Sequence, residues 1–393
     1  MNRLKSISAS TLLLLFLFTF AVLLVACKPD TTNANAYSTP IEQAYFEDYD
    51  SPENKWGYID VKGRTVLEAK WDDLKEMQDP LTAANYQGKW GYIDLSGEVQ
   101  IPYQYKQVTL FENERAFVQD FQNKWLLINP SGQVLDTTDY TQVTAFQKGY
   151  SVVARVGLKG VIDVNNGIIL SLKYNSISIL GEGKFIVKMD NQYGLVENTK
   201  SLSPLKYDKI YDPSEGLLRF KKDGAYGYMD LSGQEIKPLQ YDKASNFEGQ
   251  VAMVNFDGNY HLINRQFSTI KSFSVDNLRY AGEGLWKYKQ KGKWGLVDSD
   301  GQIIMTPRYE LINKFRNNRV AVSNSDIWGY CDNNGKEVIP LKYPLVWDFY
   351  DGRARFIDDR GVGFVDKDGK IVIRDKFLEV RDFSNGKARF QTF

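Results

Sequence analysis

Residues 89–102 read Lys-Trp-Gly-Tyr-Ile-Asp-Leu-Ser-Gly-Glu-Val-Gln-Ile-Pro, and variants of this stretch recur along the chain. The marker is an aromatic residue, then Gly, then an apolar pair, then Asp or Asn. Ten copies follow one another at spacings of 33 to 35 residues. Their first positions are Trp56, Trp90, Trp125, Lys159, Tyr193, Tyr226, Tyr260, Trp294, Trp328 and Val362. A fixed period of this length is typical of repeat proteins, in which each unit buries its apolar face against its neighbours.

Each marker begins a predicted β hairpin. In the second copy, residues 90–93 are rich in strand formers. Asp94 and Gly97 supply a turn, because Asp bonds its own backbone two residues on and Gly accepts a left-handed conformation. The second strand is expected to stop at Pro102, since proline cannot donate to a ladder. Eight copies carry this turn, which begins at Asp60, Asp94, Asn129, Asp163, Asp230, Asp298, Asp332 and Asp366.

The remainder of each repeat also reads as strand. A second aromatic such as Tyr105 lies fifteen residues after the marker, and Phe111 lies six residues further on. An alternating apolar run then leads into a two-residue turn, such as Gln87-Gly88, before the next marker. Each unit is therefore a three-stranded meander, linked by a loop that can hold a fourth short strand. No segment has a sustained apolar period of 3.6 residues, so the body is predicted to be all-β.

The marker Gly is expected to let a neighbouring ring or backbone approach closely. The fourth, fifth and seventh copies depart most from the pattern. Lys159 replaces the aromatic in the fourth, no Gly follows Glu197 in the fifth, and His261 replaces the marker Gly in the seventh. We interpret these departures as drift rather than as a specialised surface.

Two arrangements of the ten antiparallel units are open: a β-propeller-like ring or arc, or an open β superhelix (solenoid). Ten blades exceed the usual four to eight. An open stack needs polar capping units, and none is visible at either end. Residues 386–390 form a last strand that no marker follows, while residues 44–46 precede the first marker in the place of such a strand. These observations favour the ring or arc.

The first residues read as a targeting segment. Arg3 and Lys5 precede an apolar run over residues 11–25, which is typical of an export signal spanning residues 1–26. Residues 24–27, Leu-Val-Ala-Cys, resemble a bacterial lipobox. The resemblance implies cleavage before Cys27 and acylation of Cys27, whose chains would anchor the protein in a bilayer. The alternative is an ordinary secretory signal followed by an incidental cysteine.

Residues 27–44 are polar and read as a flexible tether with a reach of about 20–25 Å. Residues 45–393 then form the repeat domain. The anchored protein is expected to be extracytoplasmic. Lys28 gives no acidic retention signal, so the outer membrane is favoured in a cell with two membranes.

Composition argues against several functions. The chain has 49 basic and 49 acidic residues, which gives no reason to expect binding to nucleic acid or to an acidic membrane surface. His261 is the single histidine, so a His-based metal cluster is excluded.

The repeated Asp residues are explained by turns rather than by the paired carboxylates of a glycosidase. The turns at Asp298 and Asp366 resemble calcium loops but lack the downstream Glu. Cys331 occupies an apolar position and is expected to be a buried filler. We therefore predict no catalytic, metal or cofactor residues and no enzymatic activity.

The repeats resemble the WG (KWG) repeat family of bacterial proteins. The match rests on residues 55–60, 89–94 and 293–298, with support from residues 226–230, 327–332 and 362–366. The resemblance implies a β-repeat body that is frequently exported. It brings no established catalytic or cofactor residues.

The predicted function is that of a membrane-anchored binding or scaffold lipoprotein, which recognises an envelope protein or glycan through its repeat surface. One alternative is a carbohydrate-binding or carbohydrate-acting envelope protein, and a second is a structural spacer without a specific ligand. The positions of aromatic residues that do not recur from repeat to repeat, such as Trp286, Trp347 and Tyr37, distinguish these functions. Their gathering on one exposed face indicates glycan binding, whereas dispersed or buried positions favour protein binding.

Overall fold

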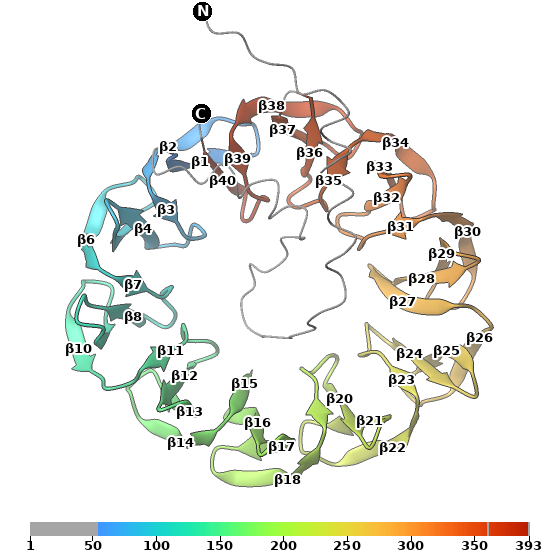
Figure 1. Ribbon diagram of the computed structural model, residues 1–393, viewed down its shortest axis with the longest axis horizontal. Helices are drawn as coiled ribbons and strands as arrows, with labels where there is room; N and C mark the ends of the chain where they lie inside the picture. The colour runs from blue at the N-terminus through green and yellow to red at the C-terminus, as the bar shows by residue number, and fades with distance from the viewer. Residues whose placement is uncertain (1–53, 360, 392–393) are drawn as a thin grey trace, which may run out of the picture. The chain divides into compact units, whose positions relative to one another are not determined.

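The computed structural model describes residues 54–359 and 361–391, and every regular element in these ranges is a β strand. Forty strands form ten antiparallel sheets of four strands each. The sheets are arranged as the blades of a ten-bladed β-propeller (Figure 1). The predicted all-β ring is confirmed, and the open superhelix is not observed. The described residues include no helix capable of crossing a membrane.

We letter the strands of each blade A to D from the inside of the ring outward, and number each blade by the marker it contains. The A strands are β39 (Glu379–Val380), β3 (Asp73–Leu74), β7 (Gln107–Val108), β11 (Gln142–Val143), β15 (Ser176–Gly181), β19 (Lys209–Ile210), β23 (Lys243–Ala244), β27 (Asn277–Gly282), β31 (Leu311–Ile312) and β35 (Leu345–Val346). The B strands are β40 (Lys387–Gln391), β4 (Thr82–Tyr86), β8 (Ala116–Gln119), β12 (Tyr150–Arg155), β16 (Lys184–Met189), β20 (Leu217–Lys222), β24 (Val251–Phe256), β28 (Leu285–Gln290), β32 (Val320–Asn324) and β36 (Ala354–Asp358).

The C strands carry the markers and the D strands form the outer rim. The C strands are β1 (Trp56–Asp60), β5 (Lys89–Ile93), β9 (Trp125–Ile128), β13 (Leu158–Asp163), β17 (Gln192–Glu197), β21 (Ala225–Asp230), β25 (Asn259–Asn264), β29 (Lys293–Asp298), β33 (Ile327–Cys331) and β37 (Gly361–Val365). The D strands are β2 (Thr65–Trp71), β6 (Val99–Tyr105), β10 (Val134–Thr137), β14 (Ile168–Tyr174), β18 (Lys200–Tyr207), β22 (Glu235–Tyr241), β26 (Thr269–Phe273), β30 (Ile303–Tyr309), β34 (Glu337–Tyr343) and β38 (Ile371–Phe377). The short fourth strand that the sequence allowed is therefore the A strand of the next blade.

Blade 1 is built from both ends of the repeat domain. Its strand order is β2-β1-β40-β39, so the chain's first described strand pairs with its last. The pairing runs in register from Trp56 opposite Gln391 to Asp60 opposite Lys387. The strand at residues 386–390, for which the sequence offers no following marker, thus finds its marker strand at the other end of the chain. The predicted signal segment, Cys27, the tether and residues 44–46 lie outside the described residues.

The marker Gly is required by a bulge in the D strand. In blade 2, Trp90 lies opposite Tyr105 and Tyr92 lies opposite Ile101, so the D strand has two extra residues beside Gly91. A Cβ on Gly91 would lie 2.5 Å from the carbonyl oxygen of Ile101. The close neighbour is therefore backbone, and the eight marker glycines share this contact, with distances of 2.4 to 2.9 Å.

Two blades replace the marker Gly, and both pair regularly at that position. His261 lies opposite Ser272 between two further in-register pairs in blade 7. Leu126 lies opposite Thr137 in blade 3, without a bulge beside it. Pairing in blades 4 and 5 keeps the bulge, although the sequence pattern marked those copies as divergent. The third copy, which the pattern did not mark, therefore differs structurally in the same way as the seventh.

The expected strand end at Pro102 is wrong. Strand β6 continues through Pro102 to Tyr105, where it pairs again with Trp90. Proline is tolerated there because the D strand is the outermost strand of the blade, and because the residue lies within the bulge.

The predicted turns are confirmed in detail. The Asp94 carboxylate accepts hydrogen bonds from the backbone N–H groups of Ser96 and Glu98, at 2.8 and 3.1 Å. Gly97 has a φ of +91° and its N–H donates to the Asp94 carbonyl. In blade 4 the left-handed residue is Asn166 rather than Gly167, because the turn keeps the same length as in blade 2, with the left-handed residue three positions after the Asp. Gln87 and Gly88, with φ of 52° and 74°, form the expected two-residue hairpin turn between the B and C strands.

The hydrophobic core lies between blades. A buried Tyr two residues after the marker packs on the Phe of the next blade, with ring centroids 4.8 Å apart for Tyr92 and Phe111. The Tyr92 hydroxyl donates to the Thr109 carbonyl of that next blade at 2.7 Å. Equivalent hydroxyl contacts join Tyr228 to Ser245 and Tyr330 to Trp347, both at 2.7 Å. Each blade thus completes the core of its neighbour.

Substitution of Gly91 by Val is expected to lower the free energy of unfolding by about 2 kcal/mol, because the side chain would overlap the Ile101 carbonyl and displace the D strand. Chemical denaturation measures the change. The matched control is Leu126→Val, at the equivalent position without a bulge, where a change below about 1.5 kcal/mol is expected. Equal losses in the two variants would contradict the role assigned to the bulge.

Candidate functional site

The B strands carry cations at one position that is otherwise apolar. This position lies opposite the second residue after the marker aromatic, and is apolar in blades 2, 3, 4, 5, 7 and 9. Arg219, Lys287, Arg355 and Arg389 occupy it in blades 6, 8, 10 and 1. Each of these cations donates to a backbone carbonyl in the A strand of the next blade, at Ala244, Ile312, Val380 and Leu74 respectively.

Arg355 is the most deeply buried of these cations, with its side chain 3% exposed. Its guanidinium donates to both carboxylate oxygens of Asp382, at 2.7 and 3.1 Å, and to the Val380 carbonyl at 3.1 Å. It also lies over the Trp347 ring, 4.3 Å from the centroid. A guanidinium buried to this degree needs a paired carboxylate, since an uncompensated charge in the interior is costly.

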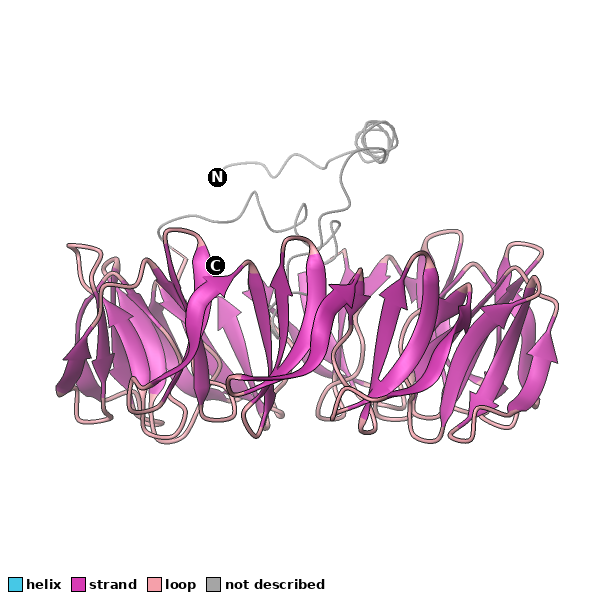
Figure 2. Cartoon of the chain, turned by 90° about the horizontal axis from the view of Figure 1, so that it is seen from below, coloured by secondary structure: helices cyan, strands magenta, loops and turns pink. Residues whose placement is uncertain are grey.

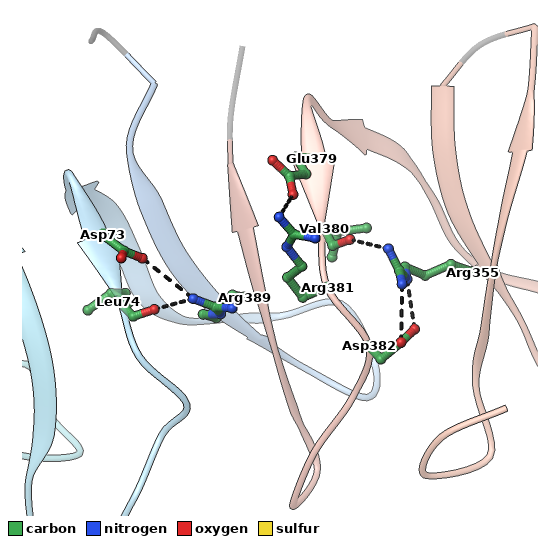
Figure 3. A network of polar contacts seen from close by, with 8 residues as sticks. All are labelled: Asp73, Leu74, Arg355, Glu379, Val380, Arg381, Asp382 and Arg389. Atoms are coloured by element: carbon green, nitrogen blue, oxygen red, sulfur yellow. Dashed lines mark hydrogen bonds and ion pairs between the residues drawn. The ribbon is translucent and has the colours of Figure 1, made fainter. Parts of the chain in front are cut away.

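Neighbouring ion pairs extend this contact across the closure of the ring (Figure 3). Arg389 in β40 reaches Asp73 and the Leu74 carbonyl of blade 2. Arg381 pairs with Glu379 on the A strand of blade 1. These contacts and the Arg355–Asp382 pair connect blades 10, 1 and 2 through their inner strands.

Asp348 follows the A strand of blade 10, the blade that also carries Arg355. Burial raises the pKa of its carboxyl to about 6, although Arg316, whose Nε lies 3.8 Å away, opposes the shift. Burial also lowers the pKa of the Lys287 amino group to about 8. We call Asp73, Lys287, Arg316, Asp348, Arg355, Glu379, Arg381, Asp382 and Arg389 the inner charge cluster. Its carboxylates each have a cation within 4 Å, which favours a role in holding the blades together.

The inner charge cluster was missed by sequence reasoning, although a signal was present. Residues 354–356 and 388–390 both read Ala-Arg-Phe, which places an arginine between two positions expected to be buried. An arginine inside an apolar run indicates a buried cation with a partner. The partner itself, such as Asp382, is not predictable because it lies on another blade.

The histidine and the cysteine that the sequence singled out lie in the core. His261 is 8% exposed, its Nδ1 lies 2.8 Å from the Ser272 hydroxyl, and its ring stacks on Phe256. Cys331 is buried, its thiol contacts the Tyr309 hydroxyl at 3.4 Å, and burial raises its pKa. Both residues fill space between strands.

The aromatics outside the repeated offsets do not form an exposed platform. Trp286 is fully buried and Trp347 is 8% exposed. Tyr37 and the predicted lipid-attachment residue Cys27 lie outside the described residues.

The calcium-like turns use their carboxylates internally. Asp298 accepts hydrogen bonds from the N–H groups of Asp300 and Gln302, at 3.0 and 2.8 Å. Asp366 accepts from Asp368 and Lys370 in the same way. Among residues 54–359 and 361–391, no three His, Cys, Asp or Glu side chains converge as a metal site.

A surface hollow of about 560 Å³ lies where blades 8 and 9 meet. Its lining residues are Arg308, Tyr309, Asn324, Gly335, Lys336, Glu337 and Leu341. The Tyr309 hydroxyl lies 3.1 Å from Glu337, and the equivalent pair between blades 5 and 6, Tyr207 and Glu235, lies 2.7 Å apart. The hollow is therefore part of a repeated blade contact rather than a unique site.

The strands run between two layers of turns (Figure 2). One layer, the A–B face, carries the A–B and C–D turns, and the other, the B–C face, carries the B–C turns and the links between blades. On the A–B face, hydrogen bonds join the turns of successive blades. Side chains accept from the next turn's backbone N–H at Glu112 from Gly149 (3.3 Å), Glu283 from Asn318 (2.8 Å), Asn317 from Gly352 (2.8 Å) and Asp351 from Gly386 (2.7 Å).

Arginines add a second set of contacts between blades on the A–B face. Arg115, Arg319 and Arg353 donate to carbonyls in the C–D turn of the next blade. The same face presents exposed carboxylates at the tips of its A–B turns. These are Glu114, Glu182, Glu215, Glu283 and Asp351, all with positive φ. The A–B face thus has acidic tips, and hydrogen bonds join its turns in blades 3 and 4 and in blades 8, 9, 10 and 1.

Fold and site together define a ten-bladed β-propeller whose repeated aromatics are used in packing between blades. Eight segments match the family model described as WG containing repeat: residues 56–90, 90–125, 160–193, 198–224, 226–260, 294–326, 328–359 and 363–392. They span more than half of the chain, and the protein belongs to the WG-repeat family. The matches leave out residues 126–159 and 261–293, which begin with the Leu126 and His261 that replace the marker Gly.

Several solved structures match this chain at low similarity. A eukaryotic initiation factor is 10% identical, with 86% of this chain and 98% of that chain covered and a TM-score of 0.42. BamB from Moraxella catarrhalis is 10% identical, with 81% and 91% covered and a TM-score of 0.33. PorZ from Porphyromonas gingivalis is 10% identical, with 84% of this chain but 55% of that chain covered and a TM-score of 0.29. Comparison with curated proteins gave no match.

Replacement of Asp382 by Ala is expected to lower the free energy of unfolding by about 3 kcal/mol, because it removes the carboxylate that accepts two hydrogen bonds from the buried Arg355 guanidinium. The control is Asp139→Ala, which removes the exposed partner of Arg155 and should cost less than about 1 kcal/mol. Urea denaturation of both variants gives the comparison. A small loss in Asp382→Ala would show that the pair does not hold blades 10 and 1 together.

Asp348 should make stability depend on pH between about 4 and 6. Its folded-state pKa of about 6 exceeds the ordinary value of 3.8, so the native state takes up a proton first as the pH falls. The contribution of Asp348 to stability is therefore fully present below pH 3.8 and is lost as the pH rises through 6. The change in free energy of unfolding caused by Asp348→Asn is therefore expected to differ between the two pH values. The substitution should be about 2 kcal/mol more stabilising at pH 7 than at pH 4. Denaturation curves of the variant and the wild type at pH 4 and pH 7 provide the measurement. The same effect of the substitution at both pH values would contradict the burial of an ionised Asp348.

Proposed function

We propose that the protein is a lipid-anchored, extracytoplasmic scaffold that binds a protein partner through the A–B face. The observation that carries this proposal is the chain of hydrogen bonds between the A–B turns of blades 8, 9, 10 and 1, which fixes these turn tips before any partner arrives. A preorganised surface loses little conformational entropy on binding. The exposed carboxylates on the tips would select a partner with basic side chains.

The burial of Trp286 and Trp347 supports a protein partner over a glycan. Sugar binding commonly uses exposed aromatic rings, and these two candidate rings are taken up by the core. Anchoring rests on the lipobox-like residues 24–27, whose last residue, Cys27, would carry the acyl chains. The acylated protein would then present its scaffold on the outer side of the cytoplasmic membrane or at the outer membrane.

The anchor is tested by the mass of the mature amino-terminal peptide. We expect a peptide that begins at Cys27 and carries acyl chains, and we expect Cys27→Ser to abolish both the acylation and the cleavage before residue 27. Fractionation should then find the acylated protein with membranes. An unmodified amino terminus at another position would contradict the anchor without bearing on the A–B face.

The partner is tested by crosslinking in cells, followed by purification of the full chain from detergent-extracted membranes. The double charge reversal Glu182→Lys and Glu215→Lys alters neighbouring tips of the A–B face, and is expected to reduce the crosslinked partner by about tenfold. The matched control is Asp223→Lys and Asp257→Lys, which reverses two exposed charges on the B–C face and should leave the yield unchanged.

Other outcomes decide between the alternatives. Enrichment of a glycan, with no protein crosslinked, would support the carbohydrate reading. Recovery of neither, from chains shown to be anchored, would support the structural spacer. Equal loss in both double variants would contradict the A–B face as the binding surface.

A further inference from the structure

The B–C face exposes apolar side chains on three consecutive blades. Tyr86, Phe121, Val156 and Leu158 lie in or next to the B–C turns of blades 2, 3 and 4. Their exposed fractions are 39%, 52%, 88% and 41%. We call these four residues the apolar sector. The repeat pattern has no apolar residue at these positions. Most other blades carry polar residues at the corresponding turn tips.

The contrast with those other blades is clear. Their B–C turns present Asp190, Asp223, Asp257, Lys291, Ser325 and Asp326. Blade 9 also exposes Ile327 and Leu311, but beside the exposed carboxylates of Asp326 and Glu310. Exposed Lys89 and Lys124 lie beside the apolar sector, and Arg155 lies there in an ion pair with exposed Asp139.

Val156 is the strongest single observation. It has a φ of 51°, a left-handed conformation that β-branched residues rarely adopt. Its side chain is also the most exposed of the large apolar side chains in the described part of the chain. The residue thus costs stability in two ways, through backbone strain and through contact with water. Strain that the surroundings maintain at an exposed position points to a function of the side chain.

The chain enters the propeller on this same face. Trp56, at the start of β1, pairs with Gln391 at the end of β40. Tyr86 with Lys89, and Arg155 with Leu158, are the pairs that close the B–C turns at the corresponding ends of their strands. Residue 54, the first described residue, therefore lies on the B–C face. In the proposed function the chain before it leads to the anchor at Cys27, within a few tens of ångströms of a bilayer.

We propose that the apolar sector docks on the surface of an anionic lipid bilayer. Its four side chains enter the interfacial region, while Lys89 and Lys124 contact lipid phosphates. The balanced charge of the whole chain gives no attraction to such a surface, but the local arrangement does. The docked body turns its A–B face away from the membrane. The docking surface rests on the proposed anchor, which brings the apolar sector close to the bilayer. The anchor and the docking surface are tested by different measurements.

The experiment measures how deeply the sector lies in lipid. The full acylated chain carries one introduced thiol, Val156→Cys, labelled with an environment-sensitive fluorophore. Cys331 is buried and does not compete for the label. The protein is reconstituted in vesicles of phosphatidylcholine and phosphatidylglycerol that contain a spin-labelled lipid as quencher. The matched control is Asp257→Cys, an exposed turn tip on the same face in blade 7.

We expect several-fold stronger quenching at position 156 than at position 257, and a weaker difference in vesicles of phosphatidylcholine alone. A second variant, Val156→Asn, examined with the label at Phe121→Cys, should reduce quenching at position 121. Asn adopts the left-handed conformation more readily than Val, so this variant should melt at the same or a higher temperature. A purely structural Val156 would instead give a lower melting temperature and unchanged quenching.

Equal quenching at positions 156 and 257 would overturn the proposal. So would protection of the label in native membranes that is absent in vesicles, since that outcome assigns the sector to a protein partner. The amino-terminal peptide mass separates the two proposals. An acylated chain without preferential quenching removes the docking surface and leaves the anchor, whereas an unacylated chain that still docks removes the anchor and leaves the docking surface.

Discussion

The contact between successive blades is the interaction on which the structure depends. A blade has four short strands, and its A strand has only two residues in most blades. Such a sheet cannot bury its apolar faces alone. The ring of Tyr92 against Phe111 and the hydroxyl bond to Thr109 are formed with the next blade, and the same contacts recur around the ring. Because each blade needs a neighbour on both sides, the array is stable when its two ends meet, as they do where β1 pairs with β40.

Much of this could be predicted from the sequence, because the decisive features are local. Alternating strand formers, the Asp94 turn and the Gln87-Gly88 turn are each set by residues within a few positions of one another. The bulge beside Gly91 was less accessible, since it depends on how many residues of the D strand lie opposite the marker. For that reason the end of the strand at Pro102 was misjudged, and Leu126 was not recognised as a sign of regular pairing.

The inner charge cluster marks the limit of prediction for the site. Arg355 can be recognised as a buried cation from its neighbours, but Asp382 lies on another blade, and nothing in the sequence links the two residues. The functional candidates in this chain are residues that depart from the repeat pattern. The pattern therefore does not indicate which residue each of them contacts. The strained and exposed Val156 illustrates the same point, because its conformation is visible only once the turn has been built.

The composition of blade 1 from both ends of the chain also bears on the order of biosynthesis. A ribosome delivers β1 and β2 first, and β40 last. The opening hairpin must therefore wait, lacking its inner half, while nine other blades are made. During that interval the edge of β1 is open to pairing with any strand of similar pattern, and the chain contains many. Chaperoning of this single edge would protect the whole assembly from joining the wrong repeat or a second molecule.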